Sequence, residues 1–366
     1  MPSYNTIDNW VRKCGIDEIK HTPEALENLN YATMVDECMM IGSEKLLPVL
    51  AVPSEHKGRP LQPSDVKVVG FNVKSVWTAQ TVGEVLDKSF EVVGKKPSYI
   101  ISDNDSKMRK AVELSNCTWH RDISHTLAMF MERVYKEDAE YLEFSKKMAT
   151  CKMQYCMKEI AYLQSPSQRT KARFMNLSES IDWAYTMLQI FHKLIHQEQE
   201  VFSFLRTYAS FVGEMKDMVS CIHFIETQMK HNGLSKKSIA VCRKHICATV
   251  MCGNDRMRKV GQQILDYLAE EQSLLKDNET VNNSSDIIES VFGIFKYMQS
   301  PNKLNGVTAL VLHLPVILTF KGEPDPINYN VKERLCRTKI VDINLWRDEN
   351  LMENLVAKRI RTLKTA

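Results

Sequence analysis

Three acidic residues in this chain have the side-chain type and the surroundings that phosphodiester chemistry requires. Asp36 interrupts an apolar stretch, Asp103 directly follows a short apolar run, and Glu289 lies in an amphipathic segment. A carboxylate inside an apolar strand is costly unless a metal ion or a partner compensates it. Two divalent metal ions held by carboxylates can activate a nucleophile and stabilise a leaving oxygen. The three acids are therefore candidate metal ligands.

Spacing alone is weak evidence, because the chain contains 45 aspartates and glutamates. Asp36 has an alternative interpretation as a solvent-facing residue at a strand edge, since Glu37 beside it must point to the opposite face. Asp103 competes with Asp105, because Asp-Asn-Asp-Ser is also a good helix-start sequence. For Glu289 the alternative is an ordinary glutamate on a helix surface.

The elements that would position these acids are predicted from periodicity and turn residues. Residues 31–41, 45–52 and 66–77 are rich in β-branched and apolar side chains and predict three antiparallel strands, the first two joined near Gly42-Ser43. A helix, a strand, a second helix and a fifth strand follow at 81–93, 98–102, 106–114 and 117–123. A strand that follows a crossover helix should pair in parallel.

The third acid belongs to a predicted helix over residues 286–296, with Ser285 as its cap. Its expected buried face consists of Ile288, Val291, Phe292 and Phe295. Glu289 and Lys296 are seven positions apart and share one side of the helix. A carboxylate on this side can point toward the edge of the sheet.

The order of three strands, helix, strand, helix and strand is the layout of the ribonuclease H-like fold. The chain resembles the bacterial DDE transposases of insertion sequences, whose first acid lies within the first strand, the second just after the fourth, and the third on a late helix. Residues 288–293 with Lys296 are similar to the glutamate helix of that family, and residues 43–47 are similar to the segment after its first acid. The resemblance covers about residues 28–125 and 284–314.

The fold class that follows is α/β, a ribonuclease H-like five-stranded mixed sheet with flanking helices and a large all-helical insertion. The expected domains, in chain order, are a partial helix-turn-helix-like DNA-binding segment and linker (1–27), the first part of the catalytic core (28–125), the helical insertion (126–283), the closing glutamate helix (284–315) and a C-terminal tail (316–366).

The resemblance implies metal-dependent DNA strand cleavage and strand transfer at insertion-sequence ends, with Asp36, Asp103 and Glu289 as catalytic residues and ligands of two Mg²⁺ or Mn²⁺ ions. The implied partners are double-stranded DNA, as element ends and target, and further copies of the chain, since the family commonly works as a dimer or larger assembly. Two alternatives stay open. One is a catalytically inactive, transposase-derived DNA-binding protein, and the other is a ribonuclease H-like nuclease without strand transfer.

Further residues are expected to assist. Asp122-Ile123-Ser124-His125 resembles an accessory motif that follows the fifth strand in related transposases, which makes Asp122 and His125 auxiliary candidates beside Asp105; a helix-capping pair is the alternative. The cations expected to contact DNA phosphates are Lys107, Arg109, Lys110, Lys296, Arg12 and Lys13.

The N-terminal segment places Ile7, Trp10 and Val11 on one helical face, ahead of Gly15 as the expected helix stop. This segment resembles the second helix of a helix-turn-helix, although the first helix of such a motif is absent. An ordinary capped surface helix is the alternative.

Composition adds little about partners, because 48 Lys and Arg nearly balance 45 Asp and Glu. Ten scattered cysteines fit a reducing compartment rather than a disulfide framework. The longest apolar run, 307–320, is broken by His313 and Pro315, and the first residues lack the order of an export signal. We therefore expect a cytoplasmic protein without a membrane partner, and the resemblance implies a bacterial, nucleoid-associated one.

Overall fold

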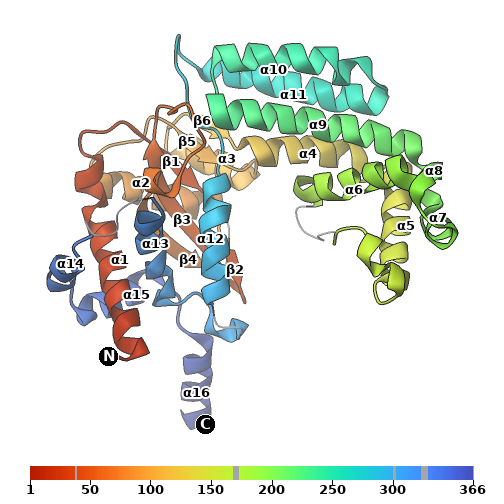
Figure 1. Ribbon diagram of the computed structural model, residues 1–366. Helices are drawn as coiled ribbons and strands as arrows, with labels where there is room; N and C mark the ends of the chain where they lie inside the picture. Colours follow the sequence, from red (N-terminus) through yellow and green to blue (C-terminus); the bar gives the residue numbers. More distant parts are fainter. Residues whose placement is uncertain (38, 168–172, 300–301, 323–328, 366) are drawn as a thin grey trace. The chain divides into compact units, whose positions relative to one another are not determined.

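The chain divides into two compact units. The computed structural model (Figure 1) describes residues 1–37, 39–167, 173–299, 302–322 and 329–365. Unit 1 comprises Met1–Asp122 and Val281–Ala366, and unit 2 comprises Ile123–Thr280. Among these described residues, no helix combines the length and the apolar character needed to cross a membrane.

Unit 1 contains a mixed sheet. Its strands are β1 (Tyr31–Val35), β2 (Met39–Ile41), β3 (Glu44–Pro53), β4 (Lys67–Lys74), β5 (Ile100–Ser102) and β6 (Trp119–Arg121). β3 is antiparallel to β1, β2 and β4, whereas β5 is parallel to both β1 and β6. The prediction of an α/β protein with a mixed sheet is confirmed, but the described sheet has six strands rather than five.

The additional strand arises because the predicted first strand, 31–41, is divided in two. Val35 of β1 lies opposite Val49, whereas Met39 of β2 lies opposite Leu46, so the register on β3 shifts by one residue across the break. The break falls at Asp36-Glu37. In a continuous strand, adjacent carboxylates would enter both faces of a buried sheet, which is unfavourable. The predicted hairpin is confirmed, with Gly42 at φ 63° in its turn.

The two crossover helices of the sheet are α2 (Ala79–Val93) and α3 (Ser106–Leu114), which pack against each other. Helices were predicted at 81–93 and 106–114, and both are observed. One core cluster joins them to the sheet, and it contains Val35, Leu47, Trp77, Val82, Leu86, Phe90, Ile100, Met108, Ala111 and Val112. The parallel strands thus emerge from a fully buried, rigid layer.

Helix α1 (Tyr4–Leu26) runs well beyond its predicted end at Gly15, so that prediction is wrong. Gly15 is buried in the middle of the helix, and a Cβ added there would lie 1.8 Å from the carbonyl oxygen of Leu312. The glycine therefore permits close approach of another backbone segment instead of ending the helix. No local pattern reveals a contact of this kind.

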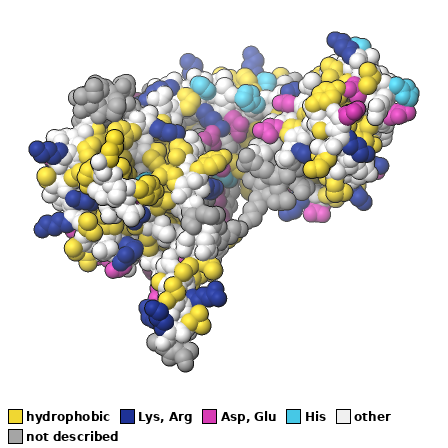
Figure 2. Space-filling model, turned by 60° about the horizontal axis from the view of Figure 1, so that its bottom comes forward, with side chains coloured by type: hydrophobic (Ala, Val, Ile, Leu, Met, Phe, Trp, Pro, Cys, Tyr) yellow, Lys and Arg dark blue, Asp and Glu magenta, His cyan; other side chains and the backbone are white. Residues whose placement is uncertain are grey.

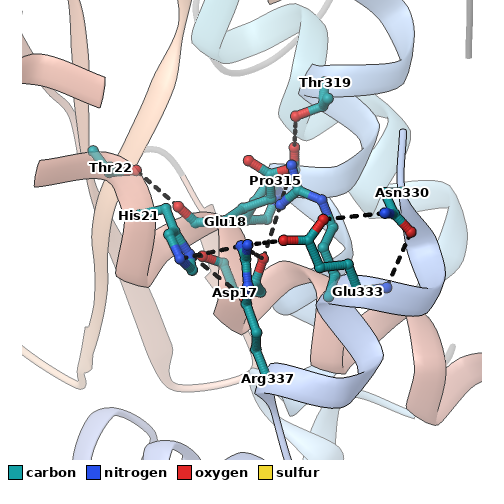
Figure 3. Close-up of polar contacts among 10 residues, drawn as sticks. Asp17, Glu18, His21, Thr22, Pro315, Thr319, Asn330, Glu333 and Arg337 are labelled. Carbon is teal, nitrogen blue, oxygen red and sulfur yellow. Dashed lines mark hydrogen bonds and ion pairs between the residues drawn. The ribbon is translucent and has the colours of Figure 1, made fainter. Parts of the chain in front are cut away.

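The C-terminal part of unit 1 is helical. Its helices are α12 (Asp286–Met298), α13 (His313–Gly322), α14 (Val331–Arg337), α15 (Ile340–Asn350) and α16 (Leu355–Thr365). Helices α13, α14 and α15 all contact α1. In the contact with α14, Arg337 lies against His21 and Glu333, and Asn330 caps the helix through the backbone N–H of Glu333 (Figure 3).

Unit 2 consists of helices around its own core. They are α4 (Ile123–Tyr135), α5 (Ala139–Tyr155), α6 (Leu177–Ile190), α7 (His196–Phe202), α8 (Phe204–Thr207), α9 (Ala209–Asn232), α10 (Lys236–Ala248) and α11 (Asp255–Leu274). Arg256 of α11 forms ion pairs with Asp138, Glu140 and Glu214 at 2.6–3.1 Å. The hydroxyl of Tyr135 also donates to Glu214, so the buried carboxylate is well compensated.

Candidate functional site

Three aspartates follow the three parallel strands of unit 1. The register pairs Met34 with Ile101 between β1 and β5, and Ser102 with Arg121 between β5 and β6. Asp36 directly follows β1, Asp103 directly follows β5 and Asp122 directly follows β6, so these three aspartates form a row at the carboxyl ends of neighbouring parallel strands. The backbone N–H of Asp122 extends the β6 pairing by donating to the carbonyl of Ser102 at 2.8 Å. Carboxyl ends of parallel strands are a common place for ligand sites.

Asp103 and Asp105, the two candidates for the second metal-binding acid, have different local roles. The carboxylate of Asp103 accepts a hydrogen bond from the backbone N–H of Asp105 at 3.2 Å, which closes the turn after β5. Asp105 is the N-cap of α3 and accepts from the backbone N–H of Lys107 at 2.8 Å. Asp103 belongs to the row of strand-end aspartates, whereas Asp105 belongs to the helix.

Asp122 connects this row to the helix that carries Glu289. Its side chain is fully buried, and one carboxylate oxygen accepts from the backbone N–H of Ser285 at 2.6 Å and from the Ser285 hydroxyl at 2.8 Å. Ser285 is the N-cap residue of α12, as predicted, but its side chain makes no capping bond within the helix. The hydroxyl is turned to the sheet instead, so β6 fixes the start of α12.

Glu289 lies in the first turn of α12, four residues after Ser285, which is about 6 Å along the helix axis. The predicted buried face is confirmed: Ile288, Val291, Phe292 and Phe295 are at most 3% exposed. Glu289 and Lys296 are both exposed and share the opposite side with Gly293.

A second buried carboxylate holds the segment that follows α12. Glu44, the first residue of β3, is 2% exposed and accepts from the backbone N–H of Val307 at 2.7 Å. Gly306 has φ 61°, and a Cβ there would lie 2.4 Å from the Glu44 carboxylate. Burial raises the pKa of the Glu44 carboxyl, and the hydrogen bond from Val307 offsets only part of that rise. The sheet thus anchors the chain on both sides of α12 through Asp122 and Glu44.

A network of ion pairs lies beside the aspartate row. The ammonium group of Lys107 is 2.6 Å from one oxygen of Glu37 and 3.3 Å from Asp105, and Lys45 binds the other oxygen of Glu37. Burial raises the pKa of the Glu37 carboxyl, but the hydrogen bonds from Lys107 and Lys45 outweigh it and the pKa lies below its usual value. Lys107, expected to contact DNA, here connects the residue after Asp36 to the loop after Asp103.

The remaining expected DNA contacts on α3 and α12 lie at the surface. Arg109 forms an exposed ion pair with Glu113 at 3.0 Å, which a phosphate could replace at little cost. Lys110 and Lys296 are exposed.

The two expected cations of α1 are differently placed. Arg12 pairs with Asp8 one turn earlier at 2.6 Å, and the ammonium group of Lys13 donates to the carbonyl of Leu335 at 2.6 Å. Asp8 also contacts His313 at 2.8 Å. Both cations therefore serve contacts within unit 1.

His125 lies in the first turn of α4 and is half-buried, in the unit that begins at Ile123. The strand-end row and the α12 anchor are built from unit 1 alone. Sequence reasoning singled out Asp122 as auxiliary but missed its bond to Ser285, and it included Glu44 only in a segment of family resemblance, without a role. A glutamate two residues after a hairpin glycine gives no local signal of burial.

Within the part of the chain that the structure describes, no three His, Cys, Asp or Glu side chains are gathered closely enough to hold a metal ion. Comparison with known proteins adds no assignment: no protein-family model matches the chain, and no curated protein matches it significantly.

Proposed function

We propose that this chain is a DNA transposase of the DDE type, with a ribonuclease H-like core, which cleaves and joins DNA at the ends of an insertion sequence. The observation that carries the proposal is the register of the parallel strands. It puts Asp36 and Asp103 at neighbouring positions of one sheet edge, beside the aspartate that anchors the helix of Glu289. In this proposal, three separate segments of the chain supply the acids of one site.

The donor set suits divalent ions with hard ligands. Asp36, Asp103 and Glu289 would hold two Mg²⁺ or Mn²⁺ ions, which prefer carboxylate oxygens and retain waters that substrate phosphates can replace. When bound, such ions activate the attacking oxygen and neutralise charge on the leaving oxygen. The three carboxylates are not gathered into a ligand group in this structure, so metal binding would have to draw them together.

The other acidic residues have structural roles in this proposal. Asp122 is a positioning residue, since its buried carboxylate holds the start of α12. Asp105 caps α3, which favours Asp103 as the second metal ligand. Exposed Arg109, Lys110 and Lys296 contact DNA phosphates on either side of the acids.

The test is a cleavage and joining assay. The substrate is a plasmid that carries the genomic DNA flanking both ends of the coding sequence, with a second plasmid as target. With Mg²⁺ or Mn²⁺ we expect nicks that leave 3′-hydroxyl groups, followed by joined products, and Asp36→Asn, Asp103→Asn and Glu289→Gln should each lower the rate at least a hundredfold. Glu84→Gln, an exposed charge loss on α2, is the matched control and should leave the rate unchanged.

The same assay separates the alternatives. Nicks without joined products would show a nuclease rather than a transposase. Binding of the end sequences without any metal-dependent cleavage would show an inactive DNA-binding protein. Cleavage that persists in all three acid variants would overturn the assignment of the site.

A further inference from the structure

The last helix of the chain is amphipathic, yet it leaves its apolar side uncovered. Val356, Ile360 and Leu363 are spaced to form one stripe along α16, and the last two are 51% and 67% exposed. The helix also carries four cations and no acidic residue; they are Lys358, Arg359, Arg361 and Lys364. In Figure 2, apolar and basic side chains cover the segment projecting at the bottom of the view, which is α16.

The start of α16 is fixed by a hydrogen-bonded cap. The side chain of Asn354 caps the helix by accepting from the backbone N–H groups of Val356 and Ala357, at 2.9 and 3.1 Å, and its amide donates to the carbonyl of Asn305 at 3.1 Å. The principal neighbour of α16 is the short helix η6 (Lys303–Asn305). A helix of 11 residues is marginal in water without packing. A helical α16 therefore requires a surface that covers its stripe.

A surface of opposite charge exists on α15. The inner side of α15 is buried through Ile343, which packs against Ile16 and Leu312. Its outer side exposes Val341 and Leu345 by 60% and 56%. The helix carries three acids, Asp342, Asp348 and Glu349, against one cation, Arg347. It thus presents a short apolar stripe with a net negative charge, where α16 presents a short apolar stripe with a net positive charge.

We propose that α16 of one chain docks on α15 of a second copy, and that the exchange is reciprocal, so that two identical contacts hold a symmetric dimer. In this contact Ile360 and Leu363 cover Val341 and Leu345. The flanking cations of α16, Arg359 and Lys364, meet Asp348 and Glu349 of the other copy. In a two-fold symmetric dimer, the exposed apolar stripes of α15 and α16 are covered in both chains.

Charge alone would also allow α16 to follow a DNA backbone. The apolar stripe argues against DNA as the occupant, because phosphates and sugars do not bury Ile360 and Leu363. Burying two such side chains removes a substantial apolar area from water, which favours a protein surface. A second copy of this chain supplies both the apolar area and the acids.

The test uses two charge-reversal variants of the full chain. The first variant carries Arg359→Glu and Lys364→Glu on α16, and the second carries Asp348→Lys and Glu349→Lys on α15. All four side chains are exposed, so folding should be retained, and circular dichroism checks this. By sedimentation equilibrium without DNA, the wild type should be dimeric, and each variant alone should dissociate at least tenfold more readily.

An equimolar mixture of the two variants is the decisive sample. Each acidic α16 then finds a basic α15 on the other chain, and each basic α16 finds an acidic α15, so the mixture should form a heterodimer. The proposal is overturned if the wild type is monomeric, if either variant dimerises like the wild type, or if the mixture stays monomeric. A wild type that is monomeric alone, with an α16 variant that loses only DNA affinity, would identify DNA as the occupant instead.

Discussion

The carboxylate of Asp122 accepts two hydrogen bonds from Ser285, one from the backbone N–H at 2.6 Å and one from the hydroxyl at 2.8 Å, across 163 residues of sequence. The first residue belongs to the end of β6 and the second to the start of α12. Unit 1 is thereby closed by a contact between its two sequence segments. Any position that Glu289 can take depends on this contact.

Replacing Asp122 should therefore loosen α12 selectively. Asp122→Ala leaves the buried N–H of Ser285 without this acceptor, which should cost about 2–3 kcal/mol, whereas Ser285→Ala removes one donor and should cost about 1 kcal/mol. Hydrogen exchange of the α12 amides measures the effect. We expect faster exchange in α12 for Asp122→Ala while the amides of β3 stay protected. If the α12 amides of Asp122→Ala were as protected as those of the wild type, the anchoring role would be contradicted.

Glu44 should make the stability of unit 1 depend on pH. Its pKa is raised in the folded state by burial, so folding favours the protonated form. The resulting contribution to stability is therefore fully present below the unfolded pKa and is lost as pH rises through the folded pKa. Glu44→Gln keeps an oxygen acceptor for Val307 and should flatten this fall. Urea unfolding at pH 4 to 7 checks it; an unchanged pH profile in Glu44→Gln would contradict the argument.

Asp65 should make the stability of unit 1 depend on pH in the opposite direction. Burial raises the pKa of its carboxyl, but hydrogen bonds from Arg59, Lys57 and the backbone of Gln62 outweigh this and lower the pKa to about 2. The group therefore stabilises the fold above its unfolded pKa, and this contribution is lost as pH falls toward 2. We expect Asp65→Asn to lower the stability by about 1–2 kcal/mol at pH 7, after screening by solvent. The difference from wild type should vanish near pH 2.

Lys296 should contribute to DNA affinity through phosphate contact. Lys296→Ala should weaken binding to DNA of any sequence and reduce the slope of log K against log salt by about 1. Lys88→Ala, an exposed charge loss on α2, is the control and should leave the slope unchanged. Fluorescence anisotropy at several salt concentrations measures both slopes. Equal slopes for the two variants would remove Lys296 from the DNA-binding surface.

Local patterns were sufficient to predict much of unit 1. The buried face of α12 follows from apolar residues at helical spacing, and the hairpin before β3 follows from Gly42-Ser43. The division of the first strand at Asp36 was not predicted, although the two adjacent carboxylates that explain it are visible in the sequence.

Tertiary contacts explain the features that the sequence analysis predicted wrongly or did not predict. Gly15 looked like a helix stop, but its role is to admit the carbonyl of Leu312. The bond from Val307 to Glu44 spans 263 residues, and no spacing in one sequence indicates such a pair. Candidate ligands could be named from strand ends, whereas the residues that hold their supporting helix could not.

The claim that Asp36, Asp103 and Glu289 form one metal site can be tested by iron-directed cleavage of the chain. Fe²⁺ replaces Mg²⁺ on the DNA-bound protein, and ascorbate with peroxide generates radicals that cut the backbone close to the ion. The account predicts cuts near residues 36, 103 and 289, all suppressed by excess Mg²⁺ and lost in Asp36→Asn. Cuts near 36 and 103 without one near 289, or cuts confined to other segments, would contradict it.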